Sequence, residues 1–190
     1  MERARHWGNF VRIDMEDYRY NEATLDLYRT LHAVYPNHVG LVVQACLFKT
    51  QEDIQRLAEE GADLRIVKGA YREAASVAWR ERSDIDRSFL AILKKQLVTG
   101  NGTAIATHDE RIIEVIKDFI RTQHISAEQF EFQMLYGIRS GLAGRLVDEG
   151  YRVRVYVPFG DDWFAYFMRR LAERPANLAF LWRRERADNR

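Results

Sequence analysis

The amino-acid sequence predicts an α/β protein built from six βα units, arranged as part of a TIM-type barrel. Six apolar or β-branched runs alternate with segments of helical periodicity, a pattern typical of a parallel sheet. The runs begin about 22 to 39 residues apart, which is the spacing that a strand, a helix and a return connection require. Their starts lie near residues 10, 41, 64, 103, 130 and 152.

The first half of the chain supplies three of these units. Residues 1–9 resemble the end of a helix, with Gly8 suited to the left-handed position after it. The predicted strands are Phe10–Asp14, Leu41–Ala45 and Leu64–Lys68. One predicted helix, ending before Pro36, carries on one face Leu27, Tyr28, Leu31 and Val34. Thr50–Asp53 resembles a capping box and predicts the start of a helix that stops at Gly61.

The second half supplies the other three. Its predicted strands are Thr103–Thr107, Phe130–Leu135 and a run from Val153 to Val157 that ends at a turn, Pro158–Gly160. The apolar positions of the intervening helices are Ile85, Phe89, Leu93, Leu97, Ile112, Ile113, Ile116, Phe119, Leu142 and Leu146. Asp161 or Asp162 can cap a final helix. Residues 178–190 form a charged tail, and we treat residues 1–190 as a single domain.

The final helix carries a polar face. Tyr166, Arg169, Arg170 and Glu173 fall at i, i+3, i+4 and i+7. Two adjacent guanidinium groups with a carboxylate one turn away can clamp a carboxylate ligand. The alternative is a solvated helix face with an internal arginine–glutamate pair.

Polar residues at the strand ends favour a barrel over a doubly wound sheet, because active sites of barrels lie where the strands end. These residues are Asp14, Gln44, Arg65, Lys68, Thr107, His108, Gln133 and Tyr156. No Gly-x-Gly-x-x-Gly motif follows a strand, as a Rossmann dinucleotide site would require. Since a closed barrel has eight strands, we expect about two upstream units to be missing, so that this chain is the C-terminal three-quarters of a barrel.

Composition narrows the function classes. The 29 basic and 28 acidic residues give a formal charge of +1, which provides no electrostatic case for nucleic-acid binding. Cys46 is the single cysteine, and no histidine or cysteine pattern suits a metal. No apolar run approaches the roughly 20 residues of a membrane span, so we expect a cytoplasmic protein.

Several strand-end residues have a structural explanation beside a functional one. Arg65 lies within an apolar strand and needs a partner, for which Asp14 is a candidate in a structural salt bridge. Gln44 and Gln133 can contact the edge of a heterocycle or be satisfied core amides. His108 can face a ligand phosphate at a helix start or simply occupy a loop.

Taken together, these segments resemble the FAD-dependent proline dehydrogenase family. The resemblance runs in order from about residue 10 to 177. It rests on Val11–Glu16, Gly40–Ala45, Leu64–Tyr71, Ala106–His108, Phe132–Leu135, Tyr156–Gly160 and the helix with Tyr166, Arg169, Arg170 and Glu173.

The resemblance implies a distorted (βα)8 barrel that oxidises L-proline to Δ1-pyrroline-5-carboxylate, the first step of proline degradation to glutamate. Hydride passes to FAD, and a quinone-type acceptor takes the electrons, with peripheral contact at the inner face of the membrane as an option. It implies that Asp14 and Arg65 are catalytic. It implies cofactor contacts by Met15, Gln44, Arg65, Lys68, Gly69, Ala70, Thr107, His108 and Gln133. It implies substrate contacts by Tyr156, Tyr166, Arg169, Arg170 and Glu173.

One feature of the family, a substrate-binding lysine on a strand before that of Asp14, has no counterpart in this sequence. We therefore expect the isolated chain to bind FAD poorly and to turn over slowly. Two alternatives stay open: a non-catalytic binding or scaffold domain, and a flavin-free barrel enzyme that acts on a carboxylate substrate.

Overall fold

The computed structural model describes residues 1–161. The chain divides into two compact units, Met1–Val155 and Tyr156–Arg190. The first unit contains the helices described here and nearly all of the sheet.

The sheet has six strands whose spatial order follows their order in the sequence. They are β1 (Val11–Ile13), β2 (Val39–Gln44), β3 (Leu64–Val67), β4 (Thr103–Ala106), β5 (Phe130–Leu135) and β6 (Val153–Tyr156). All six are parallel, and the sheet curls into a half-barrel. The predicted strands are confirmed with their ends shifted by no more than two residues.

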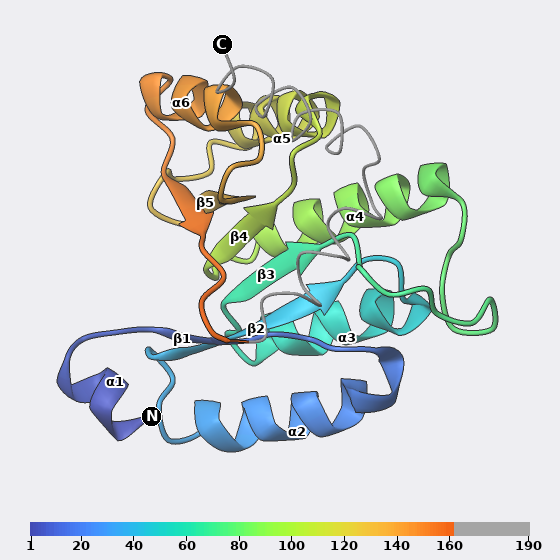
Figure 1. The fold of residues 1–190 in the computed structure, drawn as a ribbon, viewed down its shortest axis with the longest axis vertical. Coiled ribbons are helices and arrows are strands. Elements are labelled where there is room, and N and C mark those ends of the chain that lie inside the picture. The colour runs from blue at the N-terminus through green and yellow to red at the C-terminus, as the bar shows by residue number, and fades with distance from the viewer. Residues whose placement is uncertain (162–190) are drawn as a thin grey trace, which may run out of the picture. The chain divides into compact units, whose positions relative to one another are not determined.

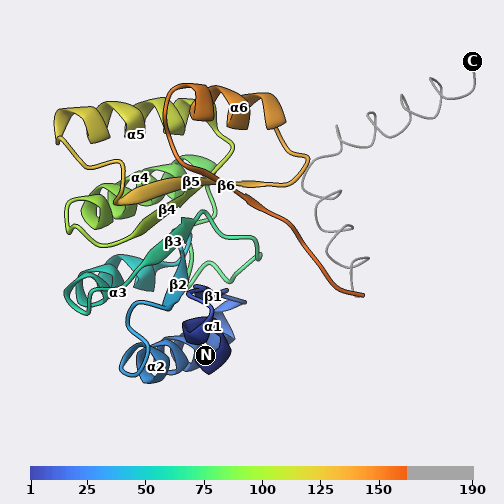
Figure 2. The ribbon, with the colours of Figure 1, turned by 90° about the vertical axis from the view of Figure 1, so that its left-hand side faces the viewer.

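One helix precedes the first strand, and helices connect each strand to the next. They are α1 (Glu2–His6), α2 (Asn21–His32), α3 (Phe48–Glu59), α4 (Arg82–Leu97), α5 (Glu110–Thr122) and α6 (Ser140–Asp148), with a 3-10 turn, η1 (Tyr18–Tyr20), before α2. Helices α2 to α5 follow one another along the same side of the sheet (Figures 1 and 2). A doubly wound sheet would reverse its strand order and place helices on both faces, so the prediction of a partial barrel is confirmed.

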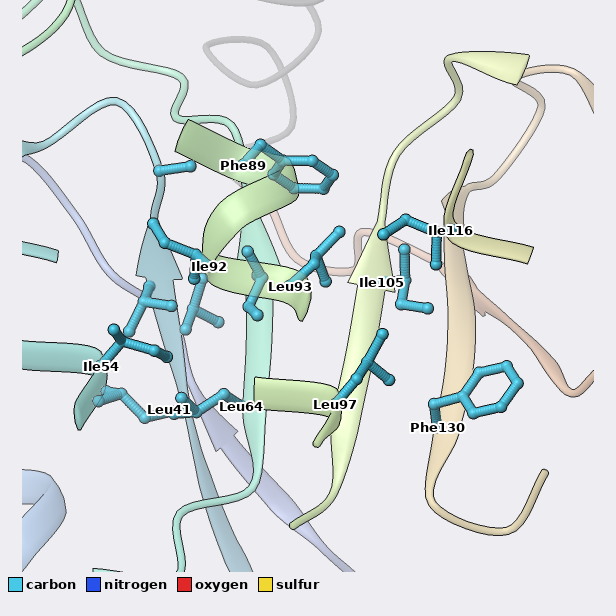
Figure 3. Close-up of a cluster of buried hydrophobic side chains, with 14 of the residues drawn as sticks. Leu41, Ile54, Leu64, Phe89, Ile92, Leu93, Leu97, Ile105, Ile116 and Phe130 are labelled. Carbon is cyan, nitrogen blue, oxygen red and sulfur yellow. The ribbon is translucent and has the colours of Figure 1, made fainter. Parts of the chain in front are cut away.

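The hydrophobic core lies between the sheet and these helices. Leu41, Leu64, Ile105 and Phe130 project from the strands toward apolar side chains of α3, α4 and α5 (Figure 3). The helical partners include Ile54, Phe89, Ile92, Leu93, Leu97 and Ile116. Each buried aliphatic side chain of this size contributes about 1.5–3 kcal/mol relative to an exposed one. Strand and helix patterns that were apolar in sequence therefore meet in one layer.

Two helix predictions were wrong in detail. Of the predicted apolar face, Tyr28 is buried and Leu31 packs against the core, but Leu27 and Val34 are 50% and 60% exposed, and α2 buries Leu25 in their place. Helix α3 begins at Phe48 rather than after Thr50, whose hydroxyl donates to the backbone oxygen of Gln44 at 2.7 Å. Thr50 therefore ties the helix to the strand before it and does not cap the helix.

Glycines end several elements as expected. Gly8, Gly61 and Gly150 follow α1, α3 and α6 with positive φ angles, where other residues would be strained. In residues 1–161, no helix has both the length and the apolar character needed to cross a membrane.

Candidate functional site

Most of the predicted site residues within 1–161 lie at the carboxyl ends of the strands. Asp14 and Met15 follow β1, Gln44 ends β2, Lys68 and Gly69 follow β3, and Thr107 follows β4. Because parallel strands end at one edge of the sheet, these residues belong to one end of the half-barrel.

Arg65 is the centre of this arrangement. Its Nη1 donates to Asp14 Oδ1 at 2.6 Å, and its Nε donates to Gln133 Oε1 at 2.5 Å. The Arg65 side chain is only 13% exposed, so its charge is held by protein partners rather than by bulk water. The structure thus brings together three residues that come from β1, β3 and β5, and it gives Arg65 the partner that the sequence suggested.

Gln133 connects Arg65 to a second ion pair. Its Nε2 donates to Glu131 Oε1 at 2.6 Å, and Arg154 holds the Glu131 carboxylate through Nε and Nη2 at 2.6 and 3.0 Å. Burial alone would raise the pKa of Glu131, but the hydrogen bonds from Arg154 and Gln133 outweigh it and lower that pKa. Glu131 is therefore an ionised acceptor at neutral pH.

Gln44 fixes the segment that follows β1. Its Nε2 donates to the backbone oxygens of Met15 at 3.2 Å and Glu16 at 2.7 Å. Met15 is itself buried, with Asn21 Nδ2 at 3.7 Å from its sulfur. The Gln44 amide nitrogen thus has the core-amide role that the sequence left open, and it sets the position of Met15.

Lys68 belongs to a different cluster from Arg65. The regular strand ends at Val67, and the Lys68 ammonium group pairs with Asp86 of α4 and lies 3.7 Å from Asp109 Oδ2. Burial alone would raise the pKa of Asp109. The hydrogen bond from Arg111 and the charge of Lys68 outweigh burial and lower that pKa to about 2. Lys68 is consequently fixed by two carboxylates beside the strand ends.

Gly69 turns the chain after this lysine. Its φ angle is +114°, and a Cβ at this position would lie 2.3 Å from Cys46 Sγ. Burial, aided by the negative charge of Glu73, raises the pKa of Cys46 to about 11. Only glycine fits here, and the following Ala70 is exposed.

Thr107 and His108 organise the turn between β4 and α5. The Thr107 hydroxyl accepts from the backbone nitrogen of Asp109 at 3.2 Å, and His108 Nε2 accepts from the backbone nitrogen of Leu135 at 3.0 Å. That contact requires an unprotonated Nε2. The start of α5, next to which the sequence offers His108 for a ligand phosphate, is capped by Asp109, which accepts from the backbone nitrogen of Arg111.

Sequence reasoning missed the acidic partners in this region. They are Glu131, Asp86, Asp109 and Glu16, the last of which accepts from the Tyr71 hydroxyl. Strand alternation carried a usable signal for one of them, because Glu131 and Gln133 are two residues apart and share a face. The other three lie on a helix or in loops, where no periodicity points to a partner.

The remaining predicted residues cannot be assigned to this arrangement. Tyr166, Arg169, Arg170 and Glu173 lie outside the described residues, and Tyr156 belongs to the second unit. Across residues 1–161, His, Cys, Asp and Glu side chains form no group of three that could hold a metal ion.

The sequential parallel sheet and its polar strand ends define a barrel-type protein with a candidate ligand site at the carboxyl ends of the strands. A family model described as proline dehydrogenase matches residues 1–183. The chain belongs to the proline dehydrogenase family.

Named relatives agree with this assignment. Proline dehydrogenase 1 of Bacillus subtilis subsp. natto is 49% identical over 178 residues, which cover 94% of this chain and 59% of the relative. Proline dehydrogenase of Deinococcus radiodurans is 46% identical over 180 residues, which cover 94% of this chain and 58% of the relative. The chain therefore spans less than two thirds of the length of the curated relatives that it matches.

A solved structure shares the fold. Proline utilization A (PutA) from Bdellovibrio bacteriovorus, inactivated by N-propargylglycine, superimposes with a TM-score of 0.85 and 29% sequence identity. The match covers 98% of this chain and 22% of the PutA chain.

Proposed function

We propose that this protein is a proline dehydrogenase that oxidises L-proline to Δ1-pyrroline-5-carboxylate with FAD as the hydride acceptor. Family membership over residues 1–183 supports the substrate and reaction. The observation that carries the proposal in the structure is Arg65 of β3, held between Asp14, which follows β1, and Gln133 of β5.

The residues at this edge suit a flavin. Bound FAD would supply the hydride acceptor and would become more anionic on reduction, and the fixed guanidinium group of Arg65 would favour that change. Gly69 and Ala70 are both exposed after β3, so a planar ring or a diphosphate at this edge can reach the backbone of the turn. The residues that would hold FAD are Met15, Gln44, Arg65, Lys68, Gly69, Ala70, Thr107, His108 and Gln133.

The substrate contacts follow from the chemistry of proline. Its carboxylate suits the adjacent Arg169 and Arg170, with Glu173 holding the pair, while Tyr156 and Tyr166 shape the pocket. Hydride loss leaves positive charge at the ring nitrogen, so the amine must be neutral when it reacts. Asp14 acts by orienting Arg65, to which it is bonded at 2.6 Å.

The electrons leave to a quinone-type acceptor in this proposal. A quinone dissolved in a bilayer is reached by peripheral contact, so the protein would work in the cytoplasm at the inner face of the membrane.

A flavin assay tests the proposal. The purified protein should bind added FAD, weakly as the sequence leads us to expect, and should bleach the visible flavin absorbance when L-proline is supplied. It should pass electrons, with slow turnover, to a soluble quinone analogue. N-propargylglycine, which inactivated the Bdellovibrio protein, should abolish the bleaching with time. Protein that never binds FAD would instead favour a scaffold role, and proline turnover that persists after FAD removal would favour a flavin-free enzyme.

A further inference from the structure

Glu131 lies next to the candidate flavin site, yet the resemblance gives it no role there. It shares a face of the sheet with Arg65, because Arg65 pairs in register with Ala104 and Ala104 pairs with Glu131. Its side chain is 16% exposed, whereas that of Arg154 is 67% exposed. Arg154 thus covers Glu131 from the solvent side and holds both carboxylate oxygens.

The contacts of Gln133 determine which end of its amide faces which partner. Arg65 has only donors, so the amide oxygen must face it, and ionised Glu131 has only acceptors, so the amide nitrogen must face it. Turning the amide by 180° would oppose donor to donor on one side and acceptor to acceptor on the other. With Gln133 buried, water cannot readily compensate either mismatch.

We propose that Glu131, held by Arg154, is a positioning residue of the flavin site that keeps the Gln133 amide oxygen directed at Arg65. The proposal rests on the proposed function, because it assigns Arg65 and Gln133 to the FAD site. Without Glu131 only Arg65 orients the amide, and the buried amide nitrogen loses its acceptor, so the bond between Gln133 and Arg65 is held less firmly. Glu131 acts only through Gln133 and touches neither cofactor nor substrate.

Four variants test this role. Glu131→Leu removes the acceptor, Glu131→Asp keeps the charge but draws the carboxylate back, and Glu131→Gln keeps an acceptor oxygen without charge. Glu128→Leu is the matched control, since Glu128 is exposed in the loop before β5. Two quantities are measured on each: the FAD dissociation constant by fluorescence titration, and the side-chain amide resonances of Gln133 in the flavin-free protein by 15N NMR.

We expect Glu131→Leu to weaken FAD binding roughly 10-fold, as losing a partner that orients a ligand-contacting residue typically does. The Gln133 amide resonances should shift in the same variant, Glu131→Asp should be intermediate, and Glu131→Gln should recover FAD affinity to within about 3-fold of the wild type. Glu128→Leu should change neither quantity.

Other results overturn the role. A Glu131→Leu protein that melts earlier but keeps the Gln133 resonances and the FAD affinity would reduce Glu131 to a stabilising ion pair. If Glu131→Leu does not fold, Glu131→Asp decides the question. Gln133 resonances and an FAD affinity equal to those of the wild type would then refute the positioning role. Failure of the wild type to bind FAD would overturn the proposed function, and the flavin role of Glu131 with it, whereas unchanged resonances refute the contact alone.

Discussion

Arg65 on β3 and Gln133 on β5 are hydrogen-bonded at 2.5 Å across the strand that separates them. The two side chains can meet because β4 presents only Ala104 and Ala106 on that face. Ala104 is in register with Arg65, and Ala106 is in register with Gln133. On its other side Arg65 reaches past β2 to Asp14. Two small residues on the central strand therefore allow one arginine to join three strands.

Ala104→Leu should block the contact between Arg65 and Gln133. Ala104 is 1% exposed, so the added side chain must push Arg65 or Glu131 aside. We expect a loss of about 1–3 kcal/mol in the free energy of unfolding, measured by urea denaturation, together with weaker FAD binding. Ala127→Leu, on the exposed loop before β5, should stay within about 0.5 kcal/mol of the wild type. Equal free energies of unfolding for the two variants would show that the contact between Arg65 and Gln133 does not require a small residue at position 104.

Gly69→Ala should destabilise the turn after β3 for two separable reasons. The positive φ angle costs about 1 kcal/mol for a residue with a Cβ, and the new methyl group meets Cys46 Sγ. Adding Cys46→Ala should relieve the second effect only, because the next contact, with Cys46 Cβ, is at 3.3 Å. A double-mutant cycle in urea should therefore give a favourable coupling energy between the two substitutions. If the two changes in unfolding free energy are strictly additive, the destabilisation by Gly69→Ala comes entirely from the backbone conformation.

Cys46 should be a slow nucleophile in the folded protein. A pKa raised from 9 to about 11 lowers its thiolate fraction roughly 100-fold at pH 8, and burial hinders the reagent as well. Ellman's reagent should label the native protein at least about 100 times more slowly than it labels Ala127→Cys in a Cys46→Ala background. The chain has one cysteine, so the signal is unambiguous. Fast labelling of native Cys46 would contradict its burial.

Asp109 should contribute acid sensitivity. Its pKa is lowered from 3.8 to about 2 in the folded state, so its contribution to stability is complete above about pH 4 and is lost as the pH falls toward 2. Asp109→Asn keeps an effective cap for α5 but removes the charge that faces Lys68 and Arg111. We expect the variant to lose about 1 kcal/mol at pH 7, allowing for solvent screening, and almost nothing at pH 2. Urea denaturation at both pH values, with Glu128→Gln as the control, decides this.

Under the proposed function, Arg169→Ala/Arg170→Ala should raise the KM for proline roughly 10- to 100-fold, since it would remove the proposed charge-assisted hydrogen bonds to the substrate carboxylate. The thermal midpoint should change little. Arg183→Ala/Arg184→Ala, a second adjacent pair followed by an acidic residue, is the matched control. An unchanged KM in steady-state assays would instead favour the alternative, in which Arg169 and Arg170 belong to a solvated helix face and do not bind substrate.

Strand positions could be predicted because apolar runs such as Leu64–Val67 and Phe130–Leu135 are bounded by turn residues. The buried face of α2 was predicted only in part: Tyr28 and Leu31 were placed correctly and Leu27 was not, since Leu27 with Leu31 and Leu25 with Tyr28 both fit helical spacing. Only the packing against β2 distinguishes the two stripes.

For the site, the residue types at the strand ends were predictable, and so was the need of Arg65 for a partner. The second partner, Gln133, was not predictable as such, because it carries no charge that would pair it with an arginine, as Asp14 does. That contact depends on the size of the β4 side chains between them.

The agreement between strand order and sequence order also bears on folding. Each strand pairs with the next along the chain, so the sheet can grow by adding one βα unit at a time to an existing edge, with modest loop closure at each step. The chain of contacts from Asp14 through Arg65, Gln133 and Glu131 to Arg154 draws on four of those strands. Its last bonds form only when β6 has docked on β5, so refolding should restore helical content before it restores the polar cluster.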